Sequence, residues 1–571
     1  MITEKIIETK KCKRCQLSFA ITDKDIHFYD MMSPTFSWKK YPIPSPTLCP
    51  DCRFQRRYAR RNERHLYKRK CDFSGETIIT MYSPDAIFPV YQNKYRWKDG
   101  RDPFKYGRDF GFSKTFGEQF KQLQNQVPRA HRFSYVEERM FNAEYNNCSW
   151  DLKNCYLTFA TWESEDTYYT DHLMQGYECM DILLGHHCHQ CYECINVENC
   201  FSVFYSQDCF DCHDSRHLND CVNCGHCIGC VGLRNQNYCI LNKTYTKEEF
   251  EKEKNKILDG DGRFAQDFLD GYHQLYLEIP KKYMHGNNNE HAIGDAISNS
   301  KNVYHSFEVS NAEEIKYCAH FFDGKNCMDF FARGEAERCY EIAGWGQNAH
   351  NYLFSAMIFG GRDSLYNDFC FYCENCLGCV WLHNQKYCIF NKQYTKDEYE
   401  KLAGKIIEHM QITGERGEFF PLALSPFAYN ESCAIDYYPL SRKEALAQWY
   451  QRLDKEYPLN VPDNLPKIKA DELPPIRAVT EDILEKLVLC EVSWKPFKII
   501  KPELEFYRKH IIPLPKRHPD QRYLERFQMR NPRKLRDRKC MKCWTGIKTS
   551  YAPERKELVY CEDCYNKEIY G

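Results

Sequence analysis

The chain carries the same cysteine-rich module at both ends, and each copy keeps the half of its cysteines that the other has lost. Each end has one complete CxxC…CxxC frame, which is the spacing of a tetrahedral four-thiolate site. The frames consist of Cys12, Cys15, Cys49 and Cys52 at the N-terminus, and of Cys540, Cys543, Cys561 and Cys564 at the C-terminus. Four thiolates leave no coordination position open, so we predict two structural zinc ions, one in each frame.

Aligning the two modules shows that each also contains a second set of four ligand positions at which most of the cysteines have been replaced. We call each set of four positions a slot, and the two incomplete sets decayed slots. His518-Pro-Asp-Gln521-Arg522 corresponds to Cys49-Pro-Asp-Cys52-Arg53. The decayed slots retain Cys490, Ser493, His518 and Gln521 in the C-terminal copy, and Cys71, Ser74, Gln92 and Tyr95 in the N-terminal copy. Ser and Gln are poor zinc ligands, so both slots are predicted to be free of metal.

These frames and their flanks resemble zinc ribbons and treble-clef zinc knuckles. The resemblance covers less than a third of the chain and implies small structural modules. The overall layout is similar to that of uncharacterised bacterial cysteine-rich proteins with zinc modules around a repetitive core, which implies an architecture and no assigned activity.

The 33 cysteines of this 571-residue chain indicate a reducing compartment. The N-terminus has no signal-peptide pattern, so we expect a cytoplasmic protein with reduced thiolates rather than a disulfide framework. No stretch of about 18 apolar residues occurs, so no membrane partner is expected.

The centre of the chain is periodic. Cys179, Cys200 and Cys221 are 21 residues apart, as are Cys318 and Cys339. A period near 20 with short apolar pieces is typical of a solenoid. We therefore predict a mainly β fold, a duplicated parallel β-solenoid with coils of about 21 residues.

The solenoid is predicted to occur twice, because the segment 229–247 recurs at 378–396 with an offset of 149 residues. Capping boxes at Thr246/Glu249 and Thr395/Glu398 then start helices that cap each copy. The predicted domains are an N-terminal double module (1–132), solenoid copies at 133–275 and 276–455, a Pro-rich linker (456–480) and a C-terminal double module (481–571).

A run of four cysteines at intervals of three is the feature that both solenoid copies share. It comprises Cys221, Cys224, Cys227 and Cys230 in the first copy and Cys370, Cys373, Cys376 and Cys379 in the second. The spacing resembles a bacterial ferredoxin loop but departs in the last interval and lacks the proline, so an iron–sulfur cluster is not expected. Interior packing as small hydrophobes and zinc binding remain as alternatives.

The charge is unevenly distributed. Residues 1–132 contain 27 Lys/Arg against 14 Asp/Glu, residues 471–571 contain 22 against 16, and the centre contains 30 against 50. Each basic end has an arginine-rich strip with interspersed aromatics, a composition suited to phosphate backbones and stacked bases. The predicted nucleic-acid contacts are Arg53, Arg56, Arg57, Arg60, Arg61, Arg64, Arg530, Arg533, Lys534 and Arg536. The alternative is that the strips contact the acidic solenoid of the same chain.

No phosphate loop, dinucleotide fingerprint, HExxH or nucleophile elbow occurs, so we expect a binding protein rather than an enzyme. The leading hypothesis is a zinc-binding protein that grips RNA, DNA or a nucleoprotein through its basic ends, with the acidic solenoid as a spacer or docking surface. The alternatives are a protein-assembly scaffold whose basic ends dock on acidic solenoids and, more weakly, an iron–sulfur or redox protein.

Overall fold

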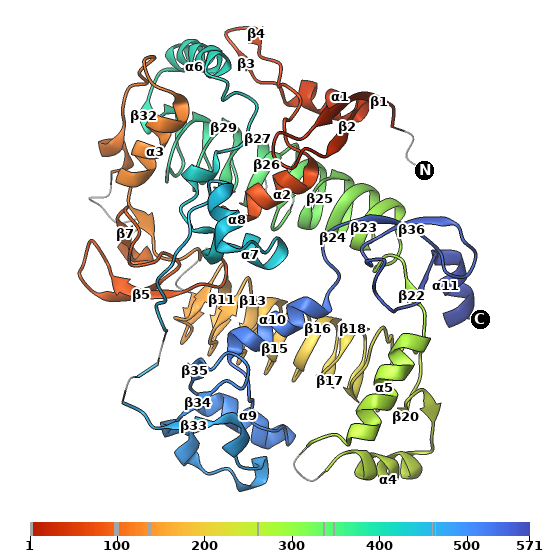
Figure 1. The fold of residues 1–571 in the computed structure, drawn as a ribbon. Coiled ribbons are helices and arrows are strands. Elements are labelled where there is room, and N and C mark those ends of the chain that lie inside the picture. Colours follow the sequence, from red (N-terminus) through yellow and green to blue (C-terminus); the bar gives the residue numbers. More distant parts are fainter. Residues whose placement is uncertain are drawn as a thin grey trace.

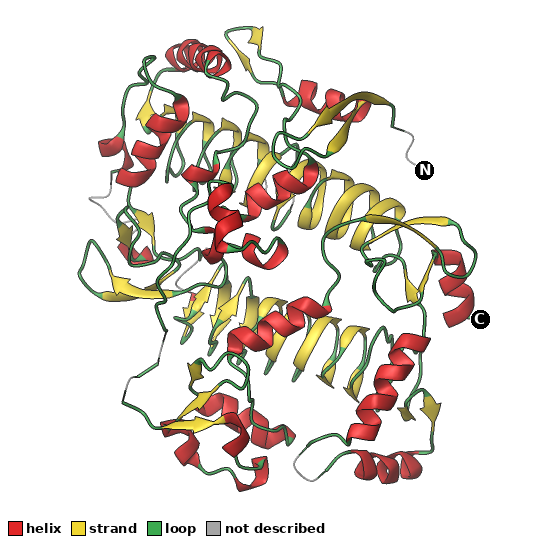
Figure 2. Cartoon of the chain, viewed as in Figure 1, coloured by secondary structure: helices red, strands yellow, loops and turns green. Residues whose placement is uncertain are grey.

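Two parallel β-solenoids lie side by side and carry the terminal modules on their surfaces (Figure 1). The computed structural model describes residues 4–95, 102–134, 139–259, 262–334, 337–346, 349–459, 461–462 and 464–571. The first solenoid runs from β9 (Met140–Phe141) to β19 (His213–Arg216) and continues as isolated bridges to Ile240, and the second runs from β23 (Glu290–Ser298) to β31 (Lys386–Ile389). The predicted mainly β, duplicated solenoid is confirmed (Figure 2).

The coils are shorter than predicted. Between β15 (Met180–His186) and β16 (Tyr192–Glu198), Ile182 pairs with Cys194, and in the second solenoid Val309 of β24 (Lys301–Lys316) pairs with Phe321 of β25 (Ala319–Phe331). Both pairings are parallel and advance the chain by one coil. The regular coil therefore has 12 residues. Side-chain hydrogen bonds show the same separation: Asn196 donates to the carboxylate of Asp208, and Asn199 donates to that of Asp211. The predicted length of 21 is therefore wrong.

The backbone explains both the coil length and the misleading period. Along the first solenoid a positive φ recurs at nearly every third residue, as at Asn196, Asn199 and Ser202. Asn, Asp and His, the residues that best tolerate this left-handed conformation, occupy many of these positions. The next residue points inward and is buried, as at Cys200. Inward positions therefore repeat every three residues, and a cysteine spacing of 21 is simply a multiple of three.

One coil of the second solenoid contains one extra residue. In this coil Glu337 pairs with His350, and Tyr340 of β26 (Tyr340–Trp345) pairs with Leu353 of β27 (His350–Leu353). The first coil of the second solenoid is one residue shorter than the regular coils, because Glu290 pairs with Lys301. From Gly294 to the longer coil, positions of the two solenoids therefore correspond at an offset of 148, and after it, where the cysteine runs lie, at an offset of 149.

Helices close the downstream end of each solenoid, as predicted. α4 (Lys247–Ile257) and α6 (Lys396–Ile412) begin with the capping boxes at Thr246 and Thr395. Phe268 of α5 (Gln266–Glu278) packs on the last coil of the first solenoid, and Ile406 of α6 belongs to the core that includes Ile389. Within the described part of the chain, no helix has the length and hydropathy that a membrane span requires.

The terminal modules are built from short hairpins and helices. The N-terminal elements are β1 (Ile6–Lys11), β2 (Ser18–Thr22), α1 (Asp23–Met32), β3 (Thr35–Phe36), β4 (Lys39–Lys40), α2 (Pro50–Tyr58), β5 (Tyr67–Lys70), β6 (Thr77–Thr80), β7 (Val90–Tyr91), α3 (Phe116–Gln126) and β8 (Arg129–Ala130). The C-terminal elements are β33 (Lys467–Lys469), β34 (Leu487–Leu489), β35 (Pro496–Phe497), α9 (Lys501–His510), α10 (Pro519–Met529), β36 (Arg536–Lys539), β37 (Gly546–Thr549), β38 (Val559–Tyr560) and α11 (Glu562–Ile569).

The modules dock in a crossed arrangement. α2 of the N-terminal module packs on β25 and β26 of the second solenoid, whereas α10 of the C-terminal module packs on β15 and β16 of the first. Figure 1 shows the red α2 against the green solenoid and the blue α10 against the yellow one. Each module therefore docks its helix on the solenoid that is farther away in the sequence.

Candidate metal centres and the basic strips

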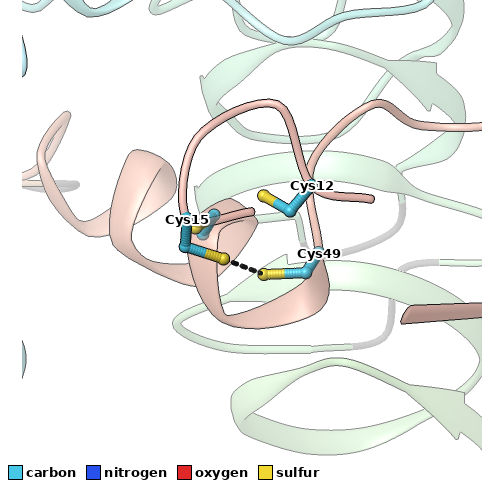
Figure 3. Close-up of side chains that lie close together, drawn as sticks. Cys12, Cys15 and Cys49 are labelled. Atoms are coloured by element: carbon cyan, nitrogen blue, oxygen red, sulfur yellow. Dashed lines mark hydrogen bonds between the residues drawn. The ribbon is translucent and has the colours of Figure 1, made fainter. Parts of the chain in front are cut away.

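The N-terminal frame forms a compact cluster of four sulfurs. Cys12 and Cys15 lie at the tip of the β1–β2 hairpin, and Cys49 and Cys52 lie at the start of α2 (Figure 3). The four Sγ atoms lie within 4.8 Å of one another, and those of Cys15 and Cys49 are 3.6 Å apart. A tetrahedron with metal–sulfur bonds of about 2.3 Å has sulfurs about 3.8 Å apart, so the cluster fits a metal ion.

The C-terminal frame repeats this geometry. The β36–β37 hairpin supplies Cys540 and Cys543, and the start of α11 supplies Cys561 and Cys564. The Sγ atoms again lie within 4.8 Å of one another, with 3.6 Å between Cys543 and Cys561. The hydrogen bond with Thr545 lowers the pKa of Cys543 to about 6, and that with Cys52 lowers the pKa of Cys49 to about 5. Both shifts favour the thiolate, the form that binds metal, at Cys543 and Cys49. The hydrogen bond with Cys49 raises the pKa of Cys52, and burial raises the pKa of Cys564.

All four aligned slots have the same backbone turn. In each, the N–H of the first cysteine donates to the carbonyl five residues later, and the N–H four residues later donates back to the carbonyl of that cysteine. These cysteines are Cys12, Cys71, Cys490 and Cys540. The N–H of the following residue donates to the carbonyls of Thr47, Val90, Lys516 and Val559, each two residues before the third ligand position. The alignment of the decayed slots is therefore confirmed.

The lone cysteines of the decayed slots accept hydrogen bonds from backbone donors. Cys71 Sγ accepts the N–H of Gln92 at 3.4 Å, and Cys490 Sγ accepts the N–H of Ser493 at 3.4 Å. In these slots the backbone N–H groups hold the turn that a metal ion would otherwise tie together. That both slots are metal-free stays a prediction.

The N-terminal arginine strip is buried, so the prediction that it forms an exposed phosphate-binding surface is wrong. Arg57 is 0% exposed, and its guanidinium contacts Asp329 at 2.6 Å. Arg53 contacts the same carboxylate at 3.0 Å, and Arg56 contacts Glu341 at 2.5 Å. Asp329 and Glu341 occupy left-handed positions one coil apart, so they form a stacked acidic pair on the face of the solenoid.

The remaining predicted contacts of the N-terminal strip are also used inside the chain. Arg60 donates to the carbonyl of Leu424 at 2.8 Å, Arg61 pairs with Glu63, and Arg64 pairs with Asp171 at 3.0 Å. A buried charge is tolerated only when it is paired or hydrogen-bonded, so these guanidinium groups are committed to the fold.

The C-terminal strip behaves in the same way, with two exceptions. Arg530 and Arg533 both pair with Glu308, whereas Lys534 is exposed and the half-buried Arg536 donates to the carbonyl of Ser550 at 3.2 Å. The predicted contact set omitted Arg522 and Arg526, which pair with Asp181 at 2.8 and 2.7 Å. Arg522 and Arg526 are the equivalents of Arg53 and Arg57, and Asp181 is the equivalent of Asp329. The sequence did indicate that such pairs could form, because the central residues contain more Asp and Glu than Lys and Arg.

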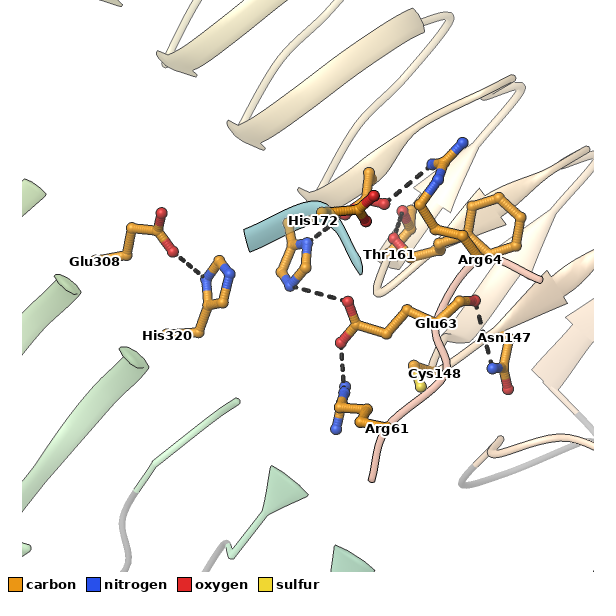
Figure 4. Close-up of polar contacts among 12 residues, drawn as sticks. Arg61, Glu63, Arg64, Asn147, Cys148, Thr161, His172, Glu308 and His320 are labelled. Atoms are coloured by element: carbon orange, nitrogen blue, oxygen red, sulfur yellow. Dashed lines mark hydrogen bonds and ion pairs between the residues drawn. The ribbon is translucent and has the colours of Figure 1, made fainter. Parts of the chain in front are cut away.

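The two solenoids meet at a buried polar seam (Figure 4). His172 of the first solenoid stacks on His320 of the second, and His320 Nδ1 lies 2.8 Å from Glu308. His172 contacts Asp171, and Glu63 lies 3.9 Å from its Nε2. Burial lowers the pKa of His320 well below its usual value, so this ring is neutral. Burial opposes the charge of Asp171, but His172 and Arg64 outweigh it and lower the pKa of Asp171 to about 2.

The solenoid cysteines are buried within the coils. Cys221 Sγ lies 3.5 Å from the carbonyl oxygens of Asn219 and Cys230, and Cys370 Sγ lies 3.4 Å from that of Cys379. Burial raises the pKa of Cys221 and of Cys370 well above the usual value. Buried sulfurs that donate to backbone carbonyls favour interior packing over metal binding. Among the described residues, the groups with ligand atoms within 4.8 Å include none of these cysteines.

Three tryptophans of the terminal modules are exposed at turns, and the sequence interpretation overlooked them. Trp494 and Trp544 are 66% and 71% exposed and lie in equivalent turns after Cys490 and Cys540. Trp38, which is 100% exposed, lies in the turn between β3 and β4. All three have a positive φ.

No family model matches the chain, and no curated protein shows significant similarity to it.

Proposed function

We propose that this protein is a non-enzymatic zinc-binding protein that holds single-stranded nucleic acid at the exposed tryptophans of its terminal modules. In this proposal the arginine strips hold the terminal modules on the solenoids through buried ion pairs. The nucleic acid binds instead at the turns that carry Trp38, Trp494 and Trp544. The zinc ions would be held by the two four-cysteine clusters, and the C-terminal ion would fix the turn that carries Trp544. Trp494 lies in the decayed slot of Cys490, whose turn is held by backbone hydrogen bonds.

The exposure of these tryptophans supports the proposal. A left-handed backbone costs a residue with a side chain about 1–2 kcal/mol, and glycine avoids this cost. Gly75 occupies the equivalent position in the slot of Cys71, with φ of 74°. Gln16 occupies the equivalent position in the slot of Cys12, with φ of 62°, so the shared turn sets the left-handed backbone in all four slots. Trp494 and Trp544 differ from Gln16 and Gly75 in placing a large apolar ring in solvent at this position.

The neighbours of the tryptophans favour nucleic acid as the partner. Exposed lysines flank each ring: Lys39 and Lys40 follow Trp38, Lys495 follows Trp494, and Lys542 and Lys548 flank Trp544. These lysines take part in surface ion pairs, for example Lys542 with Glu568, and solvent screens such exposed pairs so that they contribute little to stability. They can exchange a carboxylate for a phosphate, while the ring stacks on a base.

The test is fluorescence anisotropy with a labelled single-stranded 20-mer, as RNA and as DNA, at low salt. The triple variant Trp38→Gly/Trp494→Gly/Trp544→Gly removes the rings from positions where glycine suits the backbone, so folding is retained. Stacking contributes about 1–3 kcal/mol per base, so we expect affinity to fall on the order of 100-fold or more.

Trp449→Gly is the matched control. Trp449 is 85% exposed and has a φ of 64°, but it follows α8 (Arg442–Ala447) and lies outside the terminal modules. It should bind the oligonucleotide like the unmodified protein. Equal affinity of the triple variant and the unmodified protein would refute the proposal. Salt-dependent oligomers without oligonucleotide binding would favour the assembly scaffold instead.

A further inference from the structure

A cluster of two histidines and one aspartate lies on the outer face of the first solenoid, away from the four-cysteine centres. His213 and Asp214 belong to β19, and His226 lies in the next coil. Asp214 and His226 are one coil apart and both have a left-handed backbone, so they are neighbours in one ladder. One ligand atom from each of the three residues lies within 4.8 Å of the others, and His213 Nδ1 is 3.2 Å from Asp214 Oδ2.

The surroundings hold both rings in place. The ring of His226 stacks on Tyr238 of the following coil, with centroids 4.9 Å apart and planes 6° apart. The ring of His213 lies over Gly225, where a Cβ atom would overlap it. Glycine at this position therefore allows His213 to lie across the ladder, with its ring centroid 5.3 Å from that of His226.

The charge balance distinguishes this cluster from a second group, Glu63, Asp171 and His172, whose side chains also lie close enough together to hold a metal ion. At the seam, Glu63 and Asp171 are already neutralised by Arg61 and Arg64, so a divalent cation there would add uncompensated positive charge. Among the described residues, the only ion pair of Asp214 is with His213, and the Asp214 side chain is 41% exposed. A cation can therefore reach the carboxylate from solvent, and water can fill the open coordination positions.

We propose that His213, Asp214 and His226 bind a divalent first-row transition metal ion such as Zn²⁺, Co²⁺ or Ni²⁺. Two imidazoles and a carboxylate are ligands that suit these metals, and three protein ligands leave open positions. The site is independent of the proposed nucleic-acid function. Because the imidazoles must be unprotonated to bind, affinity should fall on acidification.

Isothermal titration of Ni²⁺ into the full-length protein, with its cysteine centres loaded, tests the proposal. We expect one equivalent beyond those centres, and we expect His226→Asn and Asp214→Asn each to weaken it at least tenfold. Asparagine is well tolerated in a left-handed backbone, so both variants should fold, and circular dichroism checks this.

His187→Asn is the matched control, because His187 is another histidine with a left-handed backbone on the same solenoid. It should bind Ni²⁺ like the unmodified protein. The proposal is overturned if the unmodified protein takes up no additional equivalent, or if His226→Asn binds with unchanged affinity.

Discussion

The imidazole rings of His172 and His320 stack with centroids 4.1 Å apart and planes 10° apart. The two residues are 148 apart and occupy corresponding positions of the two solenoids. The same offset relates Asp181 to Asp329, which receive equivalent arginines from α10 and α2. The duplicated chain thus has a pseudo-symmetric centre at this histidine pair, with one terminal module clamped on each side.

The clamp can be tested at its most buried charge. Arg57→Met leaves Asp329 with one of its two guanidinium partners, and breaking a buried pair typically costs about 3–5 kcal/mol. We expect the midpoint of urea unfolding to fall markedly. Lys13→Met removes an exposed positive charge from the same module and should change the midpoint little. A similar small effect for both variants would contradict the assignment of Arg57 to the clamp.

Metal content should distinguish complete slots from decayed ones. Elemental analysis is expected to find two zinc ions per chain, and Cys15→Ser and Cys543→Ser should each lose one. Cys71→Ser and Cys490→Ser should retain both, because backbone donors already satisfy those sulfurs. Four or more ions per chain would show that solenoid cysteines also bind metal.

The inward position of Cys224 should tolerate a small side chain better than a large one. Ser215 occupies such a position; its Oγ donates to the carbonyl of His213 at 2.7 Å and accepts the N–H of Cys227 at 2.9 Å. Cys224→Ser should therefore cost less than about 1 kcal/mol, whereas Cys224→Leu should overpack the coil and cost about 1–3 kcal/mol. Thermal unfolding of both variants checks the ranking, and equal stability would argue against close packing at Cys224.

Stability should fall as pH rises from about 4 to about 7 because of Asp436. Burial raises the pKa of this carboxyl to about 7, although Arg64 opposes the shift. Between the unfolded value of about 3.9 and pH 7, the folded state binds a proton that the unfolded state has lost, so the free energy of unfolding decreases with pH. Asp436→Asn, which can still accept from Tyr523, should remove a penalty on the order of 2–4 kcal/mol at pH 8. Its melting temperature should exceed that of the unmodified protein at pH 8 and match it at pH 4; a gain of the same size at both would contradict the assignment.

The metal slots could be predicted from the sequence because their signal is local. Each depends on residues within one module, and even the decayed slot of Cys490 keeps the proline and the arginine that align His518 with Cys49. The coil length could not be derived in the same way. Inward positions repeat every three residues, so the spacing of Cys179 and Cys200 fits several coil lengths, and only the pairing of strands selects the right one.

The burial of the N-terminal arginine strip could not be predicted from the strip itself, because its partners lie far away in the sequence. The composition of α2 alone suits a nucleic-acid surface, and its burial becomes evident only when Asp329 and Glu341 are placed beside it. The uneven charge of the chain indicated that such partners exist, but it did not identify them. The exposed tryptophans were missed because a left-handed backbone at Trp494 or Trp544 has no sequence signature except the glycine at the equivalent position 75.

The crossed docking also sets an order of events during synthesis. Arg57 and Asp329 are 272 residues apart, so at about 5–20 residues per second the ribosome needs roughly 15–50 s to make the partner of α2. During that interval the arginines of α2 lack Asp329 and Glu341, the carboxylates that pair with them in the finished protein. The N-terminal module of the growing chain therefore carries positive charge that is neutralised and covered only when the second solenoid has been made.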